Sequence, residues 1–506
     1  MMYSSIRSII DERANNCADK TFLLDAENEL AISFSQVRNA AQAVAKLIHS
    51  NGVEQGDSVA FAMNNSSACA LTVLGIMYGG YRATAINLVS GPATIAYVLE
   101  HSETKLVLTE SVQQDLLSQA FSINESVLPC IEIDAAVAQE WFYPAAESFD
   151  LTVPTSDSDA LLMYTSGTTG QPKGVLLTHA NLIAGGGNTQ LAHELNSDDR
   201  ALCVLPLYHI NGLTVTIMGP LVSGGSVVLP MRFSVSRFWP LINQYQCTWF
   251  SVVPTQISYL LHAPVENTEA TPGQTNLRFG RSASAPLSPE VQQNFEARFG
   301  VPIIETMGLT ETTAPILSNP LPPGVRKIGS PGIAFGGEVL IADKELKEVP
   351  SNCEGEILVR GASIMKAYFK NSTATSEALT ADGWLRTGDL GKKDEDGYVF
   401  VTGRLKELII KGGENIAPRE IDEALYKHPA VIEAAAFACP CSDYGQRVEA
   451  AVSIGSATEL SESTLLEFCR PHLGDFKMPD KIHFLDELPK GPSGKIQRRR
   501  LVELFT

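Results

Sequence analysis

The sequence predicts an α/β protein with a large N-terminal domain of parallel-rich sheets and packed helices, followed by a small α+β C-terminal domain. Residues 1–150 alternate short apolar runs with stretches whose apolar residues recur at helical spacing. This alternation is typical of a parallel sheet covered by helices. From residue 407 onward, shorter strand and helix patterns form a separate unit, and a chain of 506 residues has room for both.

The N-terminal elements follow from apolar spacing. Apolar residues at helical spacing predict a helix over 34–48, and a continuous apolar stretch predicts a buried helix over 68–78. Short apolar runs bounded by polar residues predict strands. These strands are expected at 59–63, 106–108, 160–163, 175–177 and 201–207, and a strand that ends in a polar loop is expected over 303–311. Strand and turn signals occur over 221–229 and 248–253.

The C-terminal elements begin after a charged turn at 392–396 and a strand at 397–401. Pro418 suits the first turn of a helix that runs to Tyr426, because its missing N–H is not needed there. Strands are expected at 431–438, 448–454 and 481–484, and a second helix at 463–469.

Composition narrows the class of function. The formal net charge of −19 argues against nucleic-acid binding, which needs a basic face. The nine cysteines show no paired metal spacing and suit a reducing compartment, so a cytoplasmic location is expected. The first twelve residues lack the apolar core of a signal peptide, and no apolar run approaches the length of a membrane span.

The stretch from Tyr164 to Gly174 predicts a phosphate-binding loop. It carries three glycines, hydroxyl residues and one lysine between two apolar runs. Glycines let backbone N–H groups turn toward one point, hydroxyls add donors, and Lys173 adds a mobile positive charge. The spacing is not that of a Walker A motif, because Lys173 is followed by glycine. The alternative is a flexible Ser/Thr/Gly turn with a solvated lysine.

Other polar residues lie where strands end. His209 either lines a cleft or is a structural histidine. Glu311 either holds magnesium or is a solvated surface glutamate. Asp389, between two turn glycines, would accept the hydroxyls of a ribose or cap the turn. The small residues of 281–287 permit close approach of a flat ligand. Lys495, between turn residues and a basic helix, is a candidate anion contact.

Together and in this order, the stretches 164–174, 307–311, 383–389, 403–413 and 492–495 resemble the adenylate-forming superfamily of acyl-CoA synthetases, peptide-synthetase adenylation domains and luciferases. The resemblance implies an N-terminal domain over 1–403, a hinge at 404–406 and a mobile lid over 407–506. It implies two half-reactions with ATP, Mg²⁺ and coenzyme A. A small carboxylic acid attacks the α-phosphate to give an acyl-adenylate and pyrophosphate, and a thiol then displaces AMP.

The resemblance also implies site residues. Lys495, Thr310, Glu311 and His209 would be catalytic, with Glu311 holding the metal. His209, Trp249 and Ala314 would contact the acid, while Lys406, Gly412 and Gly413 would form the hinge and the thiol path. Residues expected around the nucleotide are Thr165, Ser166, Gly167, Thr168, Thr169, Gly170, Lys173, Ser284, Ala285, Pro286, Glu305, Thr306, Met307, Gly308, Thr310, Asp389, Val401, Arg404 and Lys495. Met307 departs from the tyrosine that the family often carries there.

Within the superfamily, the chain looks most similar to oxalyl-CoA and other short-chain or dicarboxylate CoA ligases. The likeness rests on 221–226, Arg281-Ser282 and 318–322. The chain departs at Ala314, where the oxalyl enzymes carry a histidine that faces the substrate, so a medium-chain fatty or aryl acid stays an alternative. A carrier-protein phosphopantetheine is an alternative thiol. A nucleotide-binding protein without turnover is the competing class.

Overall fold

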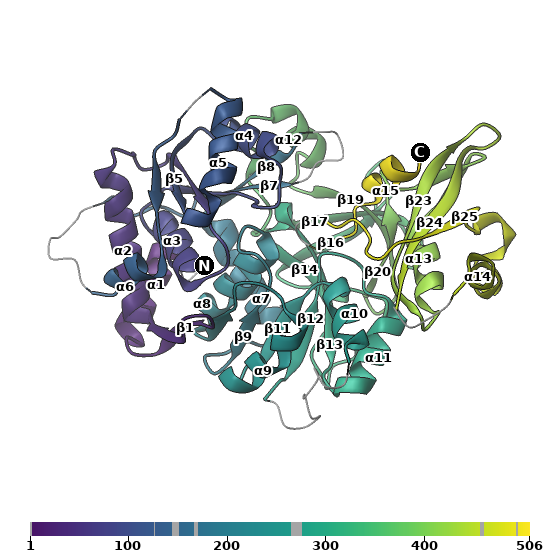
Figure 1. Ribbon diagram of the computed structural model, residues 1–506, viewed down its shortest axis with the longest axis horizontal. Helices are drawn as coiled ribbons and strands as arrows, with labels where there is room; N and C mark the ends of the chain where they lie inside the picture. Colours follow the sequence, from purple (N-terminus) through teal and green to yellow (C-terminus); the bar gives the residue numbers. More distant parts are fainter. Residues whose placement is uncertain are drawn as a thin grey trace.

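The computed structural model describes residues 3–125, 127–143, 151–165, 171–264, 276–455, 460–491 and 494–506. Over these residues the strands form four sheets, which contain nine, seven, four and five strands. Helices pack on the faces of the sheets, and the chain ends in a C-terminal domain beside the larger N-terminal one (Figure 1). The predicted α/β fold class is therefore confirmed.

The first sheet has the strand order β15-β14-β13-β12-β11-β9-β10-β1-β2. Pairing is parallel from β1 through β10, β9, β11 and β12 to β13, and antiparallel at both edges. Its strands are β1 (Thr21–Asp25), β2 (Leu30–Ser33), β9 (Arg200–Cys203), β10 (Ser226–Leu229), β11 (Trp249–Val252), β12 (Phe279–Ser282), β13 (Ile303–Leu309), β14 (Ala314–Ser318) and β15 (Ile333–Ala334).

The second sheet has the order β18-β8-β7-β4-β3-β5-β6. It is parallel from β7 to β6, while β8 pairs antiparallel with both β7 and β18. Its strands are β3 (Ser58–Ala62), β4 (Arg82–Ala85), β5 (Thr104–Thr109), β6 (Cys130–Glu132), β7 (Asp159–Thr165), β8 (Lys173–Thr178) and β18 (Ala367–Tyr368).

The largest hydrophobic core contains residues of both sheets and of the helices between them. All twelve residues of α3 are buried, as expected for a helix that is apolar on every side. The helices that contribute to this core are α1 (Ile6–Asn16), α2 (Phe34–Ser50), α3 (Ser67–Tyr78), α6 (Ala135–Glu140), α7 (His179–His193), the π-helix η2 (Asn211–Met218) and α8 (Gly219–Ser223).

Two smaller cores cover the outer faces. One lies between the first sheet and α9 (Val235–Tyr245), α10 (Pro254–His262) and α11 (Pro289–Phe299). The other lies between the second sheet and α4 (Pro92–His101) and α5 (Gln114–Ile123). Each sheet is thus covered on both faces, and the loops at the strand ends stay open to a ligand.

The third and fourth sheets complete the chain. The third is antiparallel, with β16 (Gly337–Ala342), β17 (Gly355–Gly361), β19 (Leu385–Lys393) and β20 (Val399–Arg404), and α12 (Ser372–Ala378) precedes β19. The fourth sheet forms the C-terminal domain. Its elements are β21 (Ile409–Lys411), β22 (Glu414–Ile416), α13 (Pro418–Tyr426), β23 (Val431–Cys441), β24 (Gly445–Ile454), α14 (Glu462–Lys477), β25 (Lys481–Phe484) and α15 (Arg498–Phe505).

Most predicted elements are present, with two differences. The strand expected over 201–207 ends at Cys203, and the chain then turns into η2, which no sequence signal indicated. The helix expected over 463–469 continues to Lys477, with non-helical backbone at Gly474. The chain over 221–226 completes α8 before β10 begins at Ser226.

Close packing of the first sheet gives a stability prediction at Gly280. A Cβ there would lie 2.2 Å from Phe250 Cζ and 2.7 Å from Ile303 Cδ1, side chains of the neighbouring strands. We expect Gly280→Ala to lower the free energy of unfolding by about 1–3 kcal/mol, because an added methyl group overpacks the core. Guanidinium unfolding monitored by circular dichroism measures the change.

Gly187 provides the matched control. It lies in α7, where an added Cβ would meet no described atom within 4 Å. Gly187→Ala is expected to be neutral or to stabilise by about 0.5–1 kcal/mol, since glycine is a poor helix residue. Equal midpoints for Gly280→Ala and the wild type would show that the strand tolerates the methyl group.

Candidate active site

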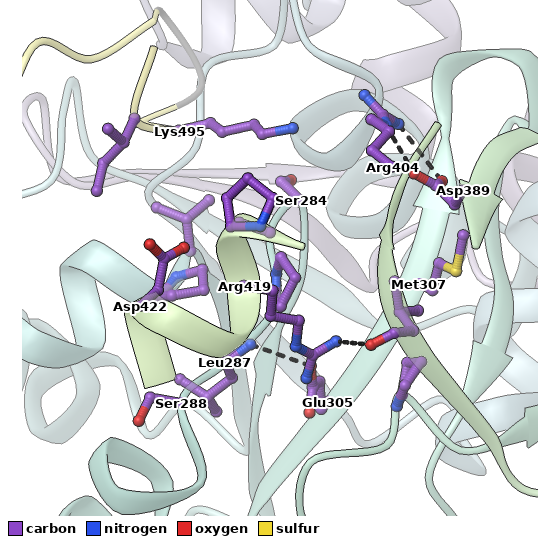
Figure 2. A pocket seen from close by; sticks show the side chains of 18 of the residues that line it. Ser284, Leu287, Ser288, Glu305, Met307, Asp389, Arg404, Arg419, Asp422 and Lys495 are labelled. Atoms are coloured by element: carbon purple, nitrogen blue, oxygen red, sulfur yellow. Dashed lines mark hydrogen bonds and ion pairs between the residues drawn. The ribbon is translucent and has the colours of Figure 1, made fainter. Parts of the chain in front are cut away.

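A cavity of about 200 Å³ lies where the carboxyl ends of β12 and β13 face β20 and the C-terminal domain (Figure 2). Crevices outside the carboxyl ends of parallel strands are common ligand sites. The residues predicted to contact the nucleotide that line this cavity are Ser284, Ala285, Pro286, Glu305, Thr306, Met307, Gly308, Asp389, Val401, Arg404 and Lys495. We call it the nucleotide cavity.

One wall of the nucleotide cavity is the loop after β12. Ser284 has a φ of 73°, in the left-handed region that favours glycine, so this turn is held by its surroundings. Glu305 supplies one constraint, because its Oε1 accepts a hydrogen bond of 3.0 Å from the backbone N–H of Leu287. Burial raises the pKa of Glu305. The carboxylate thus fixes the loop, and the backbone of 305–308 is what a flat ligand would meet.

A second wall carries an ion pair between adjacent strands. Asp389 of β19 pairs with Arg404 of β20, and the guanidinium Nε donates to Asp389 Oδ1 at 2.6 Å. Although burial opposes it, the Asp389 carboxylate raises the pKa of Arg404. The pair holds a carboxylate at the cavity edge in a fixed orientation, and such an oxygen acceptor suits sugar hydroxyls.

Lys495 enters the same cavity from the C-terminal domain. Figure 2 shows its side chain extending across the pocket toward Asp389 and Arg404. Burial, and then the Arg404 charge, lower its pKa. Glu407 also lines the cavity, and the charges of Lys495 and Arg498 outweigh burial and lower the pKa of this carboxyl. The cavity therefore contains a lysine side chain with the carboxylate of Glu407 in its electrostatic surroundings.

Glu311 and Lys173, both predicted phosphate-side residues, are connected by Tyr368. The Tyr368 hydroxyl donates to Glu311 Oε1 at 2.7 Å, and Lys173 Nζ lies 4.7 Å from the centroid of the tyrosine ring. Burial and the Glu311 charge raise the pKa of Tyr368, so the hydroxyl keeps its proton. Tyr368 comes from β18, far along the chain, and no sequence motif singled it out.

Glu311 fits the binding mode of Mg²⁺. That ion takes oxygen ligands and often binds through one or two carboxylates together with substrate phosphates. Among the described residues no group of three or more His, Cys, Asp or Glu side chains forms a closed metal cage. A single half-buried carboxylate beside Lys173 therefore suits a metal that arrives with a polyphosphate.

The remaining phosphate-side residues are only partly described. Ser166, Gly167, Thr168, Thr169 and Gly170 lie outside the described residues. Thr165 and Lys173 pair across the ends of β7 and β8, which places both ends of the loop together. Thr310 begins the short turn η4 (Thr310–Thr312) directly after β13.

His209 lies in a second cavity of about 730 Å³. Thr165 and Tyr164 also line this cavity, which we call the acyl-side cavity. Gly494, next to Lys495, lines both cavities, so the two adjoin there. His209 is thus near the predicted reacting centre, in a turn before η2 rather than at a strand end.

Neither cavity is lined by Trp249, Lys406, Gly412 or Gly413. Trp249 is a correction: its side chain is fully buried in the core and stacks on Phe279 with ring centroids 5.6 Å apart. Lys406 is exposed in the turn after β20, and Gly412 and Gly413 form the turn between β21 and β22. Ala314 begins β14, where its backbone pairs with Leu309.

Polar contacts join the two domains. Tyr259 of α10 donates to Glu433 at 2.8 Å and accepts a hydrogen bond of 2.5 Å from Lys490 Nζ, and Ser258 donates to the Ile432 carbonyl at 2.7 Å. Arg419 of α13 donates to the Val401 carbonyl at 2.6 Å. These hydrogen bonds help to hold the C-terminal domain over the cavity, and they can exchange with water.

Tyr368→Phe tests the connection between Glu311 and Lys173. The ring stays under Lys173 but Glu311 loses its hydrogen bond, so the carboxylate is less well oriented. We expect the Mg²⁺ concentration needed for half-maximal ATP binding to rise about tenfold, the effect of roughly 1.4 kcal/mol for a hydrogen bond to a charged group. Calorimetric titration of ATP at graded magnesium measures this.

Tyr398→Phe is the matched control. Tyr398 also donates its hydroxyl at 2.6 Å, to the Val325 carbonyl, and carries Lys327 over its ring at 4.6 Å. It does not line either cavity. If both variants shift the magnesium dependence alike, the effect comes from general loosening and Tyr368 has no special place.

Comparisons with known proteins agree with this geometry. Residues 10–369 match the AMP-binding enzyme family, and residues 420–495 match the AMP-binding enzyme C-terminal domain. The chain is 46% identical over 505 residues to the sulfoacetate–CoA ligase of Cupriavidus necator, covering 99% of this chain and 98% of that one. It is 35% identical to the oxalate–CoA ligase of Arabidopsis thaliana, covering 92% and 91%.

Solved structures give the same result. The o-succinylbenzoate-CoA synthetase of Bacillus subtilis has been solved with its acyl-adenylate intermediate and, separately, with ATP and a magnesium ion. Both structures match with a TM-score of 0.85. The first is 29% identical and covers 97% of each chain, and the second is 30% identical and covers 97% of this chain and 98% of the other.

The chain therefore belongs to the AMP-binding enzyme family. It is an ATP-dependent acyl-CoA ligase, an AMP-forming acid–thiol ligase that uses a carboxylic acid, ATP and coenzyme A, with the Mg²⁺ that is usual for the family. None of the helices in the described ranges is both long and apolar enough to cross a membrane.

Proposed function

We propose that this ligase acts on a small carboxylic acid that carries a second acidic group. The observation that carries the proposal is the identity of the relatives, since the 46% identical protein acts on sulfoacetate and the 35% identical protein on oxalate. Both acids are short and doubly anionic. Ala314 stands where the oxalyl enzymes carry a histidine, which counts against oxalate itself as the substrate.

The first half-reaction would use the nucleotide cavity. The backbone of 305–308 and the loop of 284–286 would hold the adenine, and Asp389 with Arg404 the ribose. Lys173 would contact the outer phosphates, and Glu311 would hold Mg²⁺, which neutralises phosphate charge when bound. Lys495 would stabilise the charge that builds on the α-phosphate as the carboxylate attacks. Thr310 would contact the same phosphate, and His209 would line the acyl path.

The second half-reaction would need a different arrangement of the C-terminal domain. We propose domains over 1–403 and 407–506 with a hinge at 404–406, centred on the exposed Lys406. Rotation would withdraw Lys495 and bring the turn of Gly412 and Gly413 to the cavity, where the pantetheine thiol displaces AMP. The hydrogen bonds between the domains support such a motion, because they can exchange with water.

Two finer points belong to this proposal. The acceptor thiol is that of coenzyme A, and no relative named here supports a carrier protein in its place. The location is the cytoplasm, since all nine cysteines are free thiols, as a reducing compartment favours.

A panel of acids tests the substrate class. Purified enzyme is incubated with ATP, magnesium, coenzyme A and one acid at a time, and the thioester is identified by mass spectrometry. We expect sulfoacetate and other short doubly anionic acids to be the best substrates. Turnover confined to medium-chain fatty acids or aryl acids would reject the proposal.

A further inference from the structure

Arg281 of β12 is a buried cation whose partners are all neutral. Its side chain is 2% exposed. Nη1 donates to Asn211 Oδ1 at 2.7 Å and to Ser251 Oγ at 3.0 Å. No described residue accepts a hydrogen bond from Nε, and no carboxylate of the described chain forms an ion pair with this guanidinium.

Among the residues that the structure describes, none supplies a counter-charge to Arg281. Burial lowers its pKa to about 9, still well above neutral pH, so the guanidinium keeps its charge. The neighbouring His193 is also buried, and burial together with the Arg281 charge lowers the pKa of His193 well below its usual value. A lone buried positive charge is costly, because it has lost water without gaining an anion.

Arg281 is not among the residues that line either cavity, but its partner Asn211 connects it to the walls of both. Its partner Asn211 is two residues from His209, which lines the acyl-side cavity. The Asn211 amide also donates to Ser284 Oγ at 3.3 Å, and Ser284 lines the nucleotide cavity. The guanidinium is thus joined through one side chain to the region between His209 and the nucleotide wall, where the proposed function places the acid.

We propose that Arg281 is a specificity-determining residue that binds the second acidic group of the substrate, with Asn211 and Ser251 holding the guanidinium in place. The inference rests on the proposed function. A guanidinium presents a planar fork of donors that matches the oxygens of a carboxylate or sulfonate. Its connection through Asn211 to the walls of both cavities favours acids whose two acidic groups are only a few bonds apart.

The test compares two acids of similar size on three proteins. Sulfoacetate carries a second acidic group and propionate does not. We expect Arg281→Gln to lower kcat/KM for sulfoacetate by about a hundredfold or more, as truncation of a buried charged partner does. For propionate we expect little loss or a gain, because the unpaired buried charge is removed. Arg281→Lys keeps the charge but not the planar fork of donors. Its kcat/KM for sulfoacetate should therefore lie between those of the wild type and Arg281→Gln.

Arg278→Gln is the matched control. Arg278 lies just before β12 and pairs with Asp199 at 2.6 Å, so its loss perturbs the same strand without removing a charge from the substrate side. Arg278→Gln should change kcat/KM for both acids by the same factor. Circular dichroism and thermal melting of each variant verify folding, and the wild-type preference for sulfoacetate over propionate is measured first.

These measurements distinguish a wrong role for Arg281 from a wrong substrate class. Selective loss on sulfoacetate in Arg281→Gln supports the inference. Equal losses on both acids, or no loss, overturn it, since Arg281 would then support the strand or bind the reacting carboxylate. A wild type that uses propionate as well as sulfoacetate overturns it even if the variants do not fold. A wild type that makes no thioester from any doubly anionic acid overturns the proposed function, and the inference with it.

Discussion

Lys495→Ala is expected to lower the rate of acyl-adenylate formation by about two orders of magnitude or more. The Lys495 side chain extends from the C-terminal domain across the nucleotide cavity toward Asp389 and Arg404 (Figure 2). A charge that acts on the transition state of one step affects that step far more than it affects ground-state binding. Single-turnover assays measure pyrophosphate release for the first step and thioester formation from supplied acyl-adenylate for the second.

Gly413→Leu should show the reverse pattern. In the present arrangement a Cβ at Gly413 would meet no described atom within 4 Å, so adenylation is expected to continue. After rotation of the lid, a leucine side chain would block the path of the thiol. Gly397→Leu is the control for backbone strain, because Gly397 has a φ of 87° against 90° at Gly413 and is equally open. If Lys495→Ala and Gly413→Leu damage the same half-reaction, the alternating lid is wrong.

Glu311→Gln is expected to reduce adenylation by about 10²–10³-fold, the usual effect of removing one electrostatic contact to developing charge. Glutamine still accepts the hydrogen bond from Tyr368, so the local geometry and the melting temperature should change little. The lost property is the negative charge that would hold Mg²⁺. Pyrophosphate release is measured over a range of magnesium concentrations, alongside ATP binding without metal.

Two results would contradict the assignment of Glu311 as the residue that holds Mg²⁺. Near-native pyrophosphate release at saturating magnesium would show that another group holds the metal. A large drop in melting temperature would show that the carboxylate is needed for the fold, and the loss of rate would then carry no information about magnesium.

The sequence predicted best those elements whose own residues decide their structure. The helix α13 begins at Pro418 and ends at Tyr426, as expected from the proline in its first turn. The buried helix α3 and the strand β25 were located equally well, since each is a distinct apolar pattern of ordinary length. Strong local periodicity is sufficient here because tertiary contacts agree with it.

The sequence did not predict which strands pair when they lie far apart along the chain. The two residues of β18 pair with β8 nearly two hundred positions earlier, and this pairing brings Tyr368 to Glu311 and Lys173. No local pattern encodes such a partner. The π-helix η2 likewise depends on its setting, as it packs against α7 and the first sheet.

The site residues also differ in how well the sequence predicted them. Motifs indicated Asp389, Arg404 and Lys495 because each lies in a short stretch of unusual composition, and all three line one cavity. Arg281 was noted only as part of a family likeness, since burial without a counter-charge cannot be read from neighbours in sequence. Trp249 shows the opposite failure, where an aromatic residue expected at the substrate packs in the core.

The separation of the hydrophobic cores of the two domains has a consequence for engineering. The buried cores of the C-terminal domain contain residues from Ile409 onward alone, and the cores of the N-terminal domain contain residues up to Val399. A modular chain of this kind should tolerate grafting of its C-terminal segment onto a related ligase, if the few hydrogen-bonding partners at Tyr259 and Ser258 are kept. The recipient should then retain its own acid preference, because the positions that correspond to Arg281 and His209 belong to its own N-terminal domain.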